Sequence, residues 1–357
     1  FHLALEVTCQ NGGDEFRPDI VIFINGLPLS YIEVKQPNAI RDGKTAIQSE
    51  QSRTAVRFEN RRFRRFNNIT QLISFSDNLP YISGQGQQKQ GSFYCSNAFS
   101  KTKFNAFKEE REEELIYSIR SLGEEEIDAV LKDVNRFALK SQPEFKTNQD
   151  PSTPCNTFIS SLYQKERLLF LLRYGLAYVE EHSKDGTIQL QKHVMRYPQF
   201  FATKAIEDAI GKGVKKGVIW HTQGSGKTAL SYFNIRYLTN YFSKQGIVPQ
   251  FYFVVDRLDL ADQATREFTK RGLKVKRINS PQELNEKHDA VVNIQKFKDN
   301  SDLTDHSGYD LNRQNIYFID EAHRSYNEKG SYLPNLYNAD KNAIKIALTG
   351  TPLITYK

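Results

Sequence analysis

A glycine-bearing loop between an apolar strand and a helix-forming run is the feature that most constrains the fold of this chain. The strand is expected over Gly217–Trp220 and the helix over Ala229–Phe242. The loop residues expected to hold a ligand are Gln223, Gly224, Ser225, Gly226, Lys227 and Thr228. In this layout backbone N–H groups and a helix N-terminus face anionic oxygens, the lysine reaches the β- and γ-phosphates, and the threonine hydroxyl binds Mg²⁺. The loop predicts a site for ATP and Mg²⁺, although His221 stands where such loops usually carry their first glycine.

An acidic motif follows an apolar run later in the chain. Ile316–Ile319 is expected to be a buried strand, and the run Asp320-Glu321-Ala322-His323 comes directly after it. At the tip of that strand Asp320 is expected to hold Mg²⁺ through water, opposite Thr228. Glu321 is then placed to polarise the water that attacks the γ-phosphate. The loop and this motif together predict an ATP-hydrolysing site.

Strands and helices alternate from Gly213 onward. Strands are expected at Gly217–Trp220, Gln250–Val255, Val275–Ile278, Ala290–Ile294, Asn315–Ile319 and Ile344–Leu348. The segments between the first four of these strands have helical periodicity. This pattern predicts an α/β domain with a mostly parallel sheet, whose ligand lies at the carboxyl ends of the strands.

Composition narrows the class of protein without deciding it. A chain of 357 residues with 39% hydrophobic and 25% charged residues suits a soluble protein of two or three domains. No apolar run is long enough for a membrane span and no signal peptide is apparent, so a cytoplasmic location is expected. The net charge of +7 is compatible with a polyanionic partner, and the 3 cysteines support neither a zinc site nor a disulfide framework. A start at Phe1 suggests missing residues upstream.

Three residues near the N-terminus form a candidate metal site. Asp19–Ile24 and Leu29–Val34 are expected to be the strands of a hairpin, which brings Asp19 back toward Glu33 and Lys35. Asp19 and Glu33 would bind a divalent cation, and Lys35 would orient the attacking water and offset charge at a scissile phosphate. On spacing alone, a plain surface hairpin with an ordinary Glu/Lys pair is equally open.

A basic segment follows the hairpin. Ala46–Ala55 has helical periodicity, and beyond it arginines alternate with the phenylalanines Phe58, Phe63 and Phe66. These arginines are Arg57, Arg61, Arg62, Arg64 and Arg65. Arg61 and Arg65 in particular are candidates for contact with a nucleic-acid backbone. The alternative, a solvated helix face over a core-facing phenylalanine stripe, stays open.

The middle of the chain is expected to connect two domains. Residues 84–91 are polar and glycine-rich, typical of a loop, and prolines mark a turn-rich stretch near 141–156. A long amphipathic helix is expected over Thr157–Glu181, followed by a strand over Thr187–Met195.

The N-terminal pattern resembles the Pro-Asp…Glu-x-Lys nuclease superfamily, because Pro18 precedes Asp19 and Gln36-Pro37 follows Lys35. The resemblance implies a restriction-endonuclease-like mixed α/β domain with Asp19, Glu33 and Lys35 as its catalytic residues. Related nucleases often carry Gln-x-x-x-Tyr on the next helix. Gln48 and Gln51 offer the glutamine, but Ser52 and Ala55 stand where the tyrosine would be.

The Asp-Glu-Ala-His motif resembles that of superfamily 2 helicases and translocases, which implies a RecA-like first lobe. Thr349, Gly350 and Thr351 are similar to the element that couples hydrolysis to DNA movement. The segment around Arg257, and Gln295 with Lys296, are similar to elements that touch the DNA. Gln199 with Tyr197 resembles a glutamine and aromatic pair that reads adenine, and a plain helix start is an equally open reading.

The order of the two motif sets resembles the restriction subunit of type I restriction-modification enzymes. The resemblance implies ATP-dependent translocation and Mg²⁺-dependent cleavage of double-stranded DNA, in a complex with modification (methyltransferase) and specificity subunits. Residues 1–145 would be the nuclease domain, 146–212 a connector, and 213–357 the first motor lobe, with no second lobe in the sequence. Alternatives are a type III-like or single-chain nuclease-helicase, or a superfamily 2 DNA remodeller that does not cut.

Overall fold

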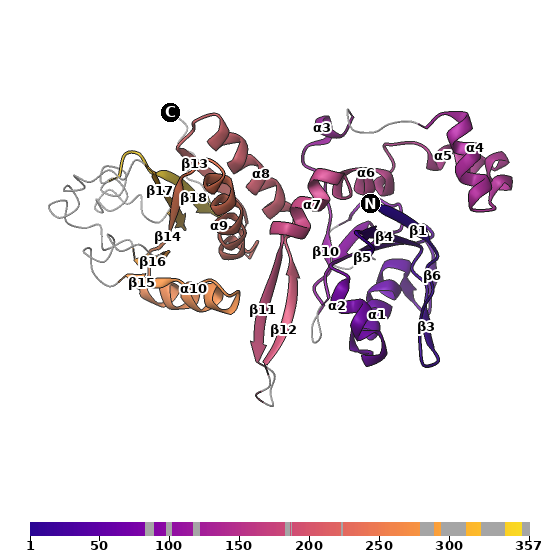
Figure 1. Ribbon diagram of the computed structural model, residues 1–357, viewed down its shortest axis with the longest axis horizontal. Coiled ribbons are helices and arrows are strands. Elements are labelled where there is room, and N and C mark those ends of the chain that lie inside the picture. The colour runs from indigo at the N-terminus through magenta and orange to yellow at the C-terminus, as the bar shows by residue number, and fades with distance from the viewer. Residues whose placement is uncertain are drawn as a thin grey trace. The chain divides into compact units, whose positions relative to one another are not determined.

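The computed structural model describes residues 1–82, 89–97, 102–116, 122–182, 186, 188–222, 224–278, 289–293, 312–322 and 340–351. The chain divides into two compact units (Figure 1). The first comprises Phe1–Leu176 and Gln191–Tyr197, and the second comprises Ala177–Leu190 and Pro198–Lys357. Within the described ranges no helix has both the length and the apolar character needed to cross a membrane.

A 6-stranded sheet in the order β1-β4-β5-β8-β9-β10 forms the centre of the first unit. Its strands are β1 His2–Leu5, β4 Ile20–Ile24, β5 Leu27–Val34, β8 Leu72–Ser76, β9 Ser92–Cys95 and β10 Asn105–Ala106. Neighbouring strands are antiparallel except β5 and β8, which are parallel. A parallel pair requires a crossover, and α1 (Ala46–Glu59) and α2 (Arg64–Ile69) provide it. The predicted hairpin is confirmed as β4 and β5.

The core of the first unit joins α1 to the strands. Phe58 of α1 packs with Val21, Tyr31 and Ile73 of three different strands. Ile47, near the start of α1 on the same buried face, packs with phenylalanines of β8 and β9. Each buried apolar side chain of this size contributes about 1.5–3 kcal/mol to folding. The position of α1 on the sheet is therefore fixed near both ends of the helix.

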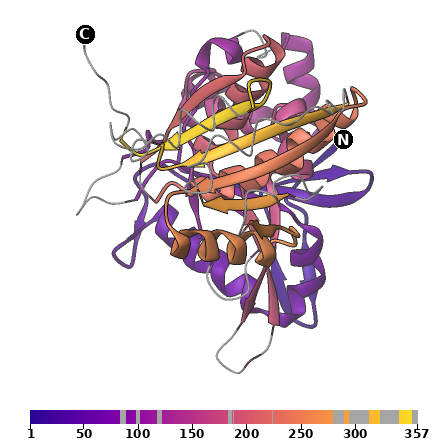
Figure 2. The same ribbon diagram turned by 90° about the vertical axis from the view of Figure 1, so that its left-hand side faces the viewer.

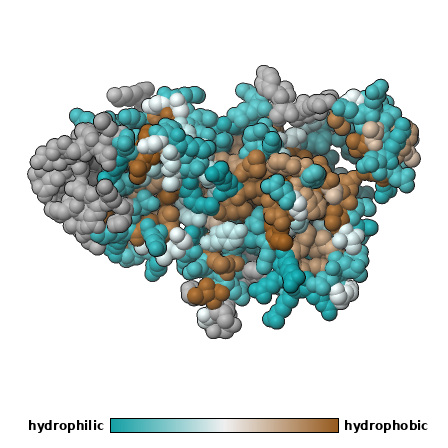
Figure 3. Space-filling view, in the orientation of Figure 1, coloured by the Kyte–Doolittle hydropathy of each residue, from teal (hydrophilic) through white to brown (hydrophobic). Residues whose placement is uncertain are grey.

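The edge of this sheet is apolar and open to solvent. Phe1, Leu3 and Leu5 on or beside β1 are 53%, 71% and 52% exposed. Figure 3 shows apolar residues gathered on the first unit around the N-terminal strand, with hydrophilic residues over most of the other coloured surface.

Short elements complete the first unit. The short strands are β2 Cys9–Asn11, β3 Asp14–Phe16, β6 Ile40–Arg41 and β7 Lys44–Thr45. The helices after the sheet are α3 Glu112–Ile116, α4 Glu124–Asp133, α5 Pro143–Asn148, α6 Pro154–Leu162 and α7 Lys165–Tyr174, and short 3-10 turns lie at Arg61–Phe63 and Phe137–Ser141.

The prediction of one long helix over Thr157–Glu181 is wrong. The chain forms α6 and α7 and then turns at Gly175 into strand β11 (Leu176–His182). A Cβ at Gly175 would lie 2.9 Å from the Leu171 side chain, so the chain packs back on its own helix there. The apolar run after this glycine belongs to a strand, and short apolar runs do not distinguish a helix from a strand by periodicity. The strand expected next is confirmed as β12 (Ile188–Val194), which pairs with β11.

A parallel 6-stranded sheet in the order β13-β18-β17-β14-β16-β15 forms the second unit (Figure 2). Its strands are β13 Lys216–Trp220, β14 Val248–Val255, β15 Lys276–Ile278, β16 Ala290–Asn293, β17 Arg313–Asp320 and β18 Ile344–Thr349. Its helices within the described residues are α8 Tyr197–Gly211, α9 Lys227–Ser243 and α10 Leu258–Lys270. The strands expected from the sequence and the α/β class are confirmed.

Candidate active sites

The β4–β5 hairpin places the predicted metal-site residues together. Ile20 pairs with Ile32, so Asp19 just before β4 lies beside the end of β5. The Val34 N–H donates to Oδ2 of Asp19 at 2.7 Å, and the Lys35 N–H donates to the Ser76 carbonyl of β8 at 2.8 Å. The end of β5 is therefore held from both neighbouring strands, just where its side chains carry the chemistry.

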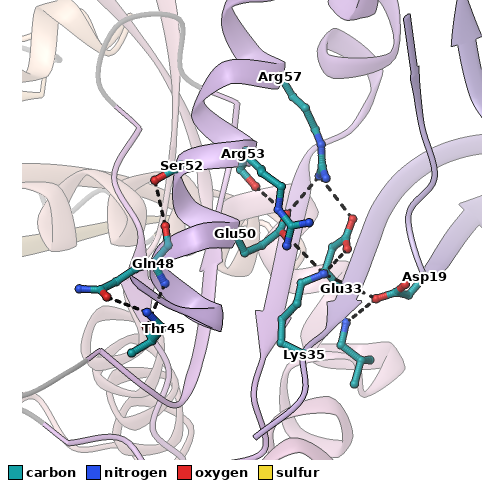
Figure 4. A network of polar contacts seen from close by, with 11 residues as sticks. Asp19, Glu33, Lys35, Thr45, Gln48, Glu50, Ser52, Arg53 and Arg57 are labelled. Atoms are coloured by element: carbon teal, nitrogen blue, oxygen red, sulfur yellow. Dashed lines mark hydrogen bonds and ion pairs between the residues drawn. The ribbon is translucent and has the colours of Figure 1, made fainter. Parts of the chain in front are cut away.

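Asp19, Glu33 and Lys35 converge on one point (Figure 4). Lys35 Nζ lies 2.6 Å from Oε2 of Glu33 and 3.9 Å from Oδ2 of Asp19. The Glu33 and Lys35 side chains are 5% and 13% exposed, whereas that of Asp19 is 43% exposed. The cluster is thus buried on the Glu33 side and open on the Asp19 side, which is where a ligand can enter.

A third carboxylate, Glu50 of α1, completes this cluster and was not predicted from the sequence. Its side chain is 0% exposed, and Lys35 Nζ lies 3.3 Å from its Oε2. Arg57 Nη1 lies 3.2 Å from Oε1 of Glu50 and 3.3 Å from Oε1 of Glu33. A signal was present, because Glu50 shares the buried helix face of Ile47 and Phe58. A charged residue on such a face requires partners inside the protein.

The charges of the cluster influence the ionisation of Glu33. Burial raises the pKa of the Glu33 carboxyl, and the Glu50 carboxylate adds to that effect. Lys35 and Arg57 oppose it, and the pKa of Glu33 stays above its ordinary value. Glu33 is therefore easier to protonate than an exposed glutamate, and the cluster is sensitive to acid.

The structure places Gln48 in a capping box, and its predicted role beside DNA stays a prediction. The Thr45 N–H donates to Oε1 of Gln48 at 2.9 Å, and the Gln48 N–H donates to Oγ1 of Thr45 at 3.2 Å. This pair is a capping box at the start of α1 (Figure 4). Gln51 is buried, and its Oε1 accepts from Lys89 Nζ at 3.4 Å.

The basic segment divides into aromatics that pack inward and, apart from Arg57, arginines that point outward. Phe58 and Phe63 are buried, and the Phe63 ring packs edge-on against Phe16 at 4.8 Å between centroids. The phenylalanines are thus core residues, as the alternative interpretation held. Arg61 and Arg65 are exposed, and their contact with DNA stays a prediction.

The loop of the second unit that was predicted to bind phosphate has a backbone conformation that requires its glycines. It runs between the ends of β13 and α9. Gly224 and Gly226 have φ of 77° and 84°, a region that other residues rarely adopt. The first turn of α9 is closed by the Leu230 N–H, which donates to the Gly226 carbonyl at 2.9 Å. Thr228 lies in that turn, and Gln223 is outside the described residues.

Lys227 of this loop reaches the acidic strand end. Its Nζ lies 3.1 Å from Oε1 of Glu321, and both side chains are largely buried. Burial raises the pKa of Asp320 to about 6, with Lys227 opposing the rise and Glu321 adding to it. Glu321 has φ of 48°, a strained value for a residue with a Cβ. Strain of this kind is typical of residues held for chemistry.

The sheet order brings further predicted residues to the same edge. β18 lies between β13 and β17, so Thr349 lies between the loop and Asp320 at the carboxyl ends of the strands. The His221 N–H donates to the Thr349 carbonyl at 3.0 Å, and Trp220 Nε1 donates to the Gly350 carbonyl at 3.1 Å. The Thr351 N–H donates to Oγ1 of Thr349 at 3.2 Å. The end of β13 and the residues that follow β18 are thus hydrogen-bonded directly.

The remaining predicted residues lie in several places. Arg257 is exposed at the N-cap of α10, whereas Gln295 and Lys296 are outside the described residues. Gln199 is buried in the second unit, and its Nε2 donates to the carbonyls of Ser225 and Gly226 at 3.3 and 3.0 Å. Tyr197 belongs to the first unit.

Tyr197 lines a cavity within the first unit. The cavity has a volume of about 530 Å³, and its wall includes Tyr81, Phe107 and Phe158. The ring of Tyr197 lies 6.4 Å from that of Phe107, between centroids. Its predicted role beside adenine stays a prediction.

Comparison with known proteins finds a matching family for each of two parts of the chain. Residues 1–113 match the family described as type I restriction enzyme R protein N terminus, and residues 198–357 match the SWI2/SNF2 ATPase family. The putative type I restriction enzyme MjaIXP endonuclease subunit of Methanocaldococcus jannaschii is 26% identical over 96% of this chain and 30% of its own length.

Relatives occur in more than one organism. The type I restriction enzyme HindI endonuclease subunit of Haemophilus influenzae is 26% identical over 98% of this chain and 31% of its own length. The MjaVIIP endonuclease subunit of Methanocaldococcus jannaschii is 44% identical over 28% of this chain and 10% of its own length. The chain spans about a third of the length of the relatives that match nearly all of it, at 30% and 31%. The N-terminal part of the chain is thus similar to type I restriction enzyme R proteins, and its C-terminal part is similar to SWI2/SNF2 ATPases.

Proposed function

We propose that this chain carries the nuclease site and the first ATP-binding lobe of a type I restriction subunit, which moves double-stranded DNA with ATP and cleaves it. Residues 1–145 would be the nuclease domain, 146–212 the connector and 213–357 the motor lobe. The convergence of Asp19, Glu33 and Lys35 at the end of β5 is the observation that carries the proposal. The family match at the N-terminus favours this order over a type III-like arrangement.

The donor set of the first unit fits Mg²⁺. Mg²⁺ in proteins is commonly held by one or two carboxylates together with water and substrate phosphate. Asp19 and Glu33 provide two carboxylates. In the described parts of the chain, no group of three or more Asp, Glu, His or Cys side chains is arranged to hold a metal ion. Bound there, Mg²⁺ would polarise the scissile phosphate and lower the pKa of a water molecule. Lys35 would orient that water and offset the negative charge that develops on the phosphate.

The second unit supports a nucleotide-driven step. Lys227 now contacts Glu321, and an ATP γ-phosphate would compete for the same ammonium group. Release from Lys227 would leave Glu321 to polarise the attacking water, while Asp320 and Thr228 would hold Mg²⁺. The segment Thr349–Thr351 accepts hydrogen bonds from the end of strand β13. It would transmit the conformational change at the nucleotide to the DNA. The modification and specificity subunits would select the site on the DNA.

The test uses the full-length subunit assembled with its modification and specificity subunits. Asp19→Asn and Glu33→Gln are expected to abolish cleavage of DNA while ATP hydrolysis continues. Unchanged cleavage by both variants would remove the nuclease assignment and leave a DNA remodeller that does not cut. Loss of ATP hydrolysis in both variants would contradict the separation of the two sites.

A further inference from the structure

Glu50 is the most deeply buried charged group of the first candidate site, and the nuclease pattern does not include it. Its carboxylate contacts Lys35 at 3.3 Å, Arg53 at 2.8 Å and Arg57 at 3.2 Å, and Oε1 also accepts from Thr54 Oγ1 at 3.2 Å. A buried carboxylate costs several kcal/mol unless its geometry and partners are good. Glu50 therefore lies among three cationic side chains at a position where an apolar residue would fit the helix face.

Lys35 and Arg57 each bridge the same two carboxylates. Lys35 Nζ contacts Oε2 of both Glu33 and Glu50, and Arg57 Nη1 contacts Oε1 of both (Figure 4). Both oxygens of Glu33 are thus occupied by cations. A divalent cation that binds Glu33 competes with Lys35 and Arg57 for that carboxylate. Glu50 offers each of these two side chains a second carboxylate that it already touches.

The charges of the cluster balance only when Glu50 is included. The carboxylates are Asp19, Glu33 and Glu50, and the cations are Lys35, Arg53 and Arg57. Without Glu50, three cationic groups would face two carboxylates. Extra positive charge at close range repels a divalent cation and strengthens the hold of Lys35 and Arg57 on Glu33. Both effects oppose metal binding.

We propose that Glu50 is a positioning residue, which keeps Lys35 and Arg57 in place when a divalent cation takes over Glu33. The proposal rests on the nuclease function proposed above. It assigns Glu50 no direct contact with DNA or metal. Its action is to hold the lysine that faces the scissile phosphate, and to let Glu33 exchange a protein cation for a metal ion.

The test measures Mn²⁺ binding by calorimetry in the full-length subunit without nucleotide. The Asp19→Asn variant gives the Mn²⁺ binding that does not depend on Asp19, and this is subtracted. Glu50→Gln is expected to weaken the Asp19-dependent binding by about 10–100-fold, the usual effect of losing a group that supports a metal site. Glu50→Asp keeps the charge and is expected to retain most of the affinity. Cleavage in the assembled complex should require correspondingly more Mn²⁺ in the Glu50→Gln variant.

Glu109 offers a matched control. It is another buried glutamate of the first unit, 2.7 Å from Arg167, and it lies in a separate ion pair from the cluster. Glu109→Gln should change thermal stability and leave Mn²⁺ affinity unchanged. Circular dichroism melting of all variants separates loss of folding from loss of binding, and Glu50→Asp carries the test if Glu50→Gln does not fold.

The outcomes distinguish the two proposals. If the wild-type subunit shows no Asp19-dependent Mn²⁺ binding, the nuclease proposal fails and the role of Glu50 fails with it. If the wild type binds Mn²⁺ and a folded Glu50→Gln variant binds equally well, only the role of Glu50 is overturned. Weakened binding in Glu109→Gln to the same extent would also overturn it, because the effect would then be a general loss of stability.

Discussion

The two units each place a lysine against a carboxylate, in different surroundings. Lys35 Nζ lies 2.6 Å from Glu33, and Lys227 Nζ lies 3.1 Å from Glu321. Lys35 shares its carboxylates with arginines of α1, whereas Lys227 forms a single ion pair within the described residues. The first arrangement is a network whose members hold each other in place. The second is a pair that one incoming phosphate can separate.

The difference follows from how each lysine is supported by the fold. Lys35 follows a central strand covered by α1, so its neighbours come from two elements packed through a common core. Lys227 begins a helix at a glycine turn, and the groups that its ammonium would meet include those of a ligand. A charge network thus accompanies the site built on a hairpin, and a simple pair accompanies the site built on a loop.

Removal of each lysine gives the largest expected effects and tests whether the sites are independent. Lys35→Ala should lower DNA cleavage by about 10²–10³-fold, because the charge on the scissile phosphate is no longer offset. ATP hydrolysis by the assembled complex should persist. Lys227→Ala should lower ATP hydrolysis by a similar factor, about 10²–10³-fold, and should stop cleavage that depends on translocation.

The exposed Lys44 is the control for both lysine variants, and Lys44→Ala should leave both activities unchanged. Cleavage that survives in Lys35→Ala, measured on circular DNA with a single recognition site, would contradict the role of that lysine.

Loss of an arginine tests whether the charge network around Glu33 stabilises the folded subunit. Arg57→Ala leaves Glu33 and Glu50 short of a buried partner and should destabilise the subunit by about 3–5 kcal/mol. Arg61→Ala, an exposed arginine nearby, should change stability by less than about 0.5 kcal/mol. Denaturant unfolding followed by circular dichroism measures both. Equal stability of the two variants would show that the network contributes nothing to the fold.

The raised pKa of Asp320 predicts acid sensitivity at the nucleotide site. In the proposed function the ionised carboxylate would hold Mg²⁺, so its protonation below about pH 6 should weaken Mg²⁺-nucleotide binding. Below that pH the affinity should fall by up to about tenfold per pH unit. Fluorescent nucleotide titration in the wild type and in Asp320→Asn isolates this effect from protonation of the nucleotide. An identical pH dependence in the two proteins would contradict the assignment.

The smallest expected effect concerns the start of α1. Gln48→Ala removes one half of the capping box and should cost about 0.5–2 kcal/mol of stability. Because α1 carries Glu50 and Arg57, a small loss of Mn²⁺ affinity is expected alongside it. A large loss of cleavage without loss of stability would instead favour the contact with DNA that the family resemblance implied for Gln48.

The sequence was informative where local pattern decides structure. Alternation and turn residues predicted the β4–β5 hairpin, and the glycines of 224–226 predicted the loop before α9. The helical periodicity over Thr157–Glu181 wrongly predicted one long helix. The close packing at Gly175 ends the helix, and the sequence pattern does not show that packing. Local sequence pattern also could not predict that Glu50 lies close to Lys35. The crossover between the parallel strands β5 and β8 brings α1, and Glu50 with it, next to the end of β5. Charges on a core-facing helix position were the available signal.

The hydrogen bond between the Val34 N–H and Oδ2 of Asp19 makes the two oxygens of that carboxylate inequivalent. One oxygen closes the hairpin, which leaves the other as the natural donor to a metal ion. An asparagine has one carbonyl oxygen and can keep the hairpin bond while presenting an NH₂ group outward. Asp19→Asn is therefore a substitution that preserves architecture and removes chemistry, whereas Asp19→Ala would remove both.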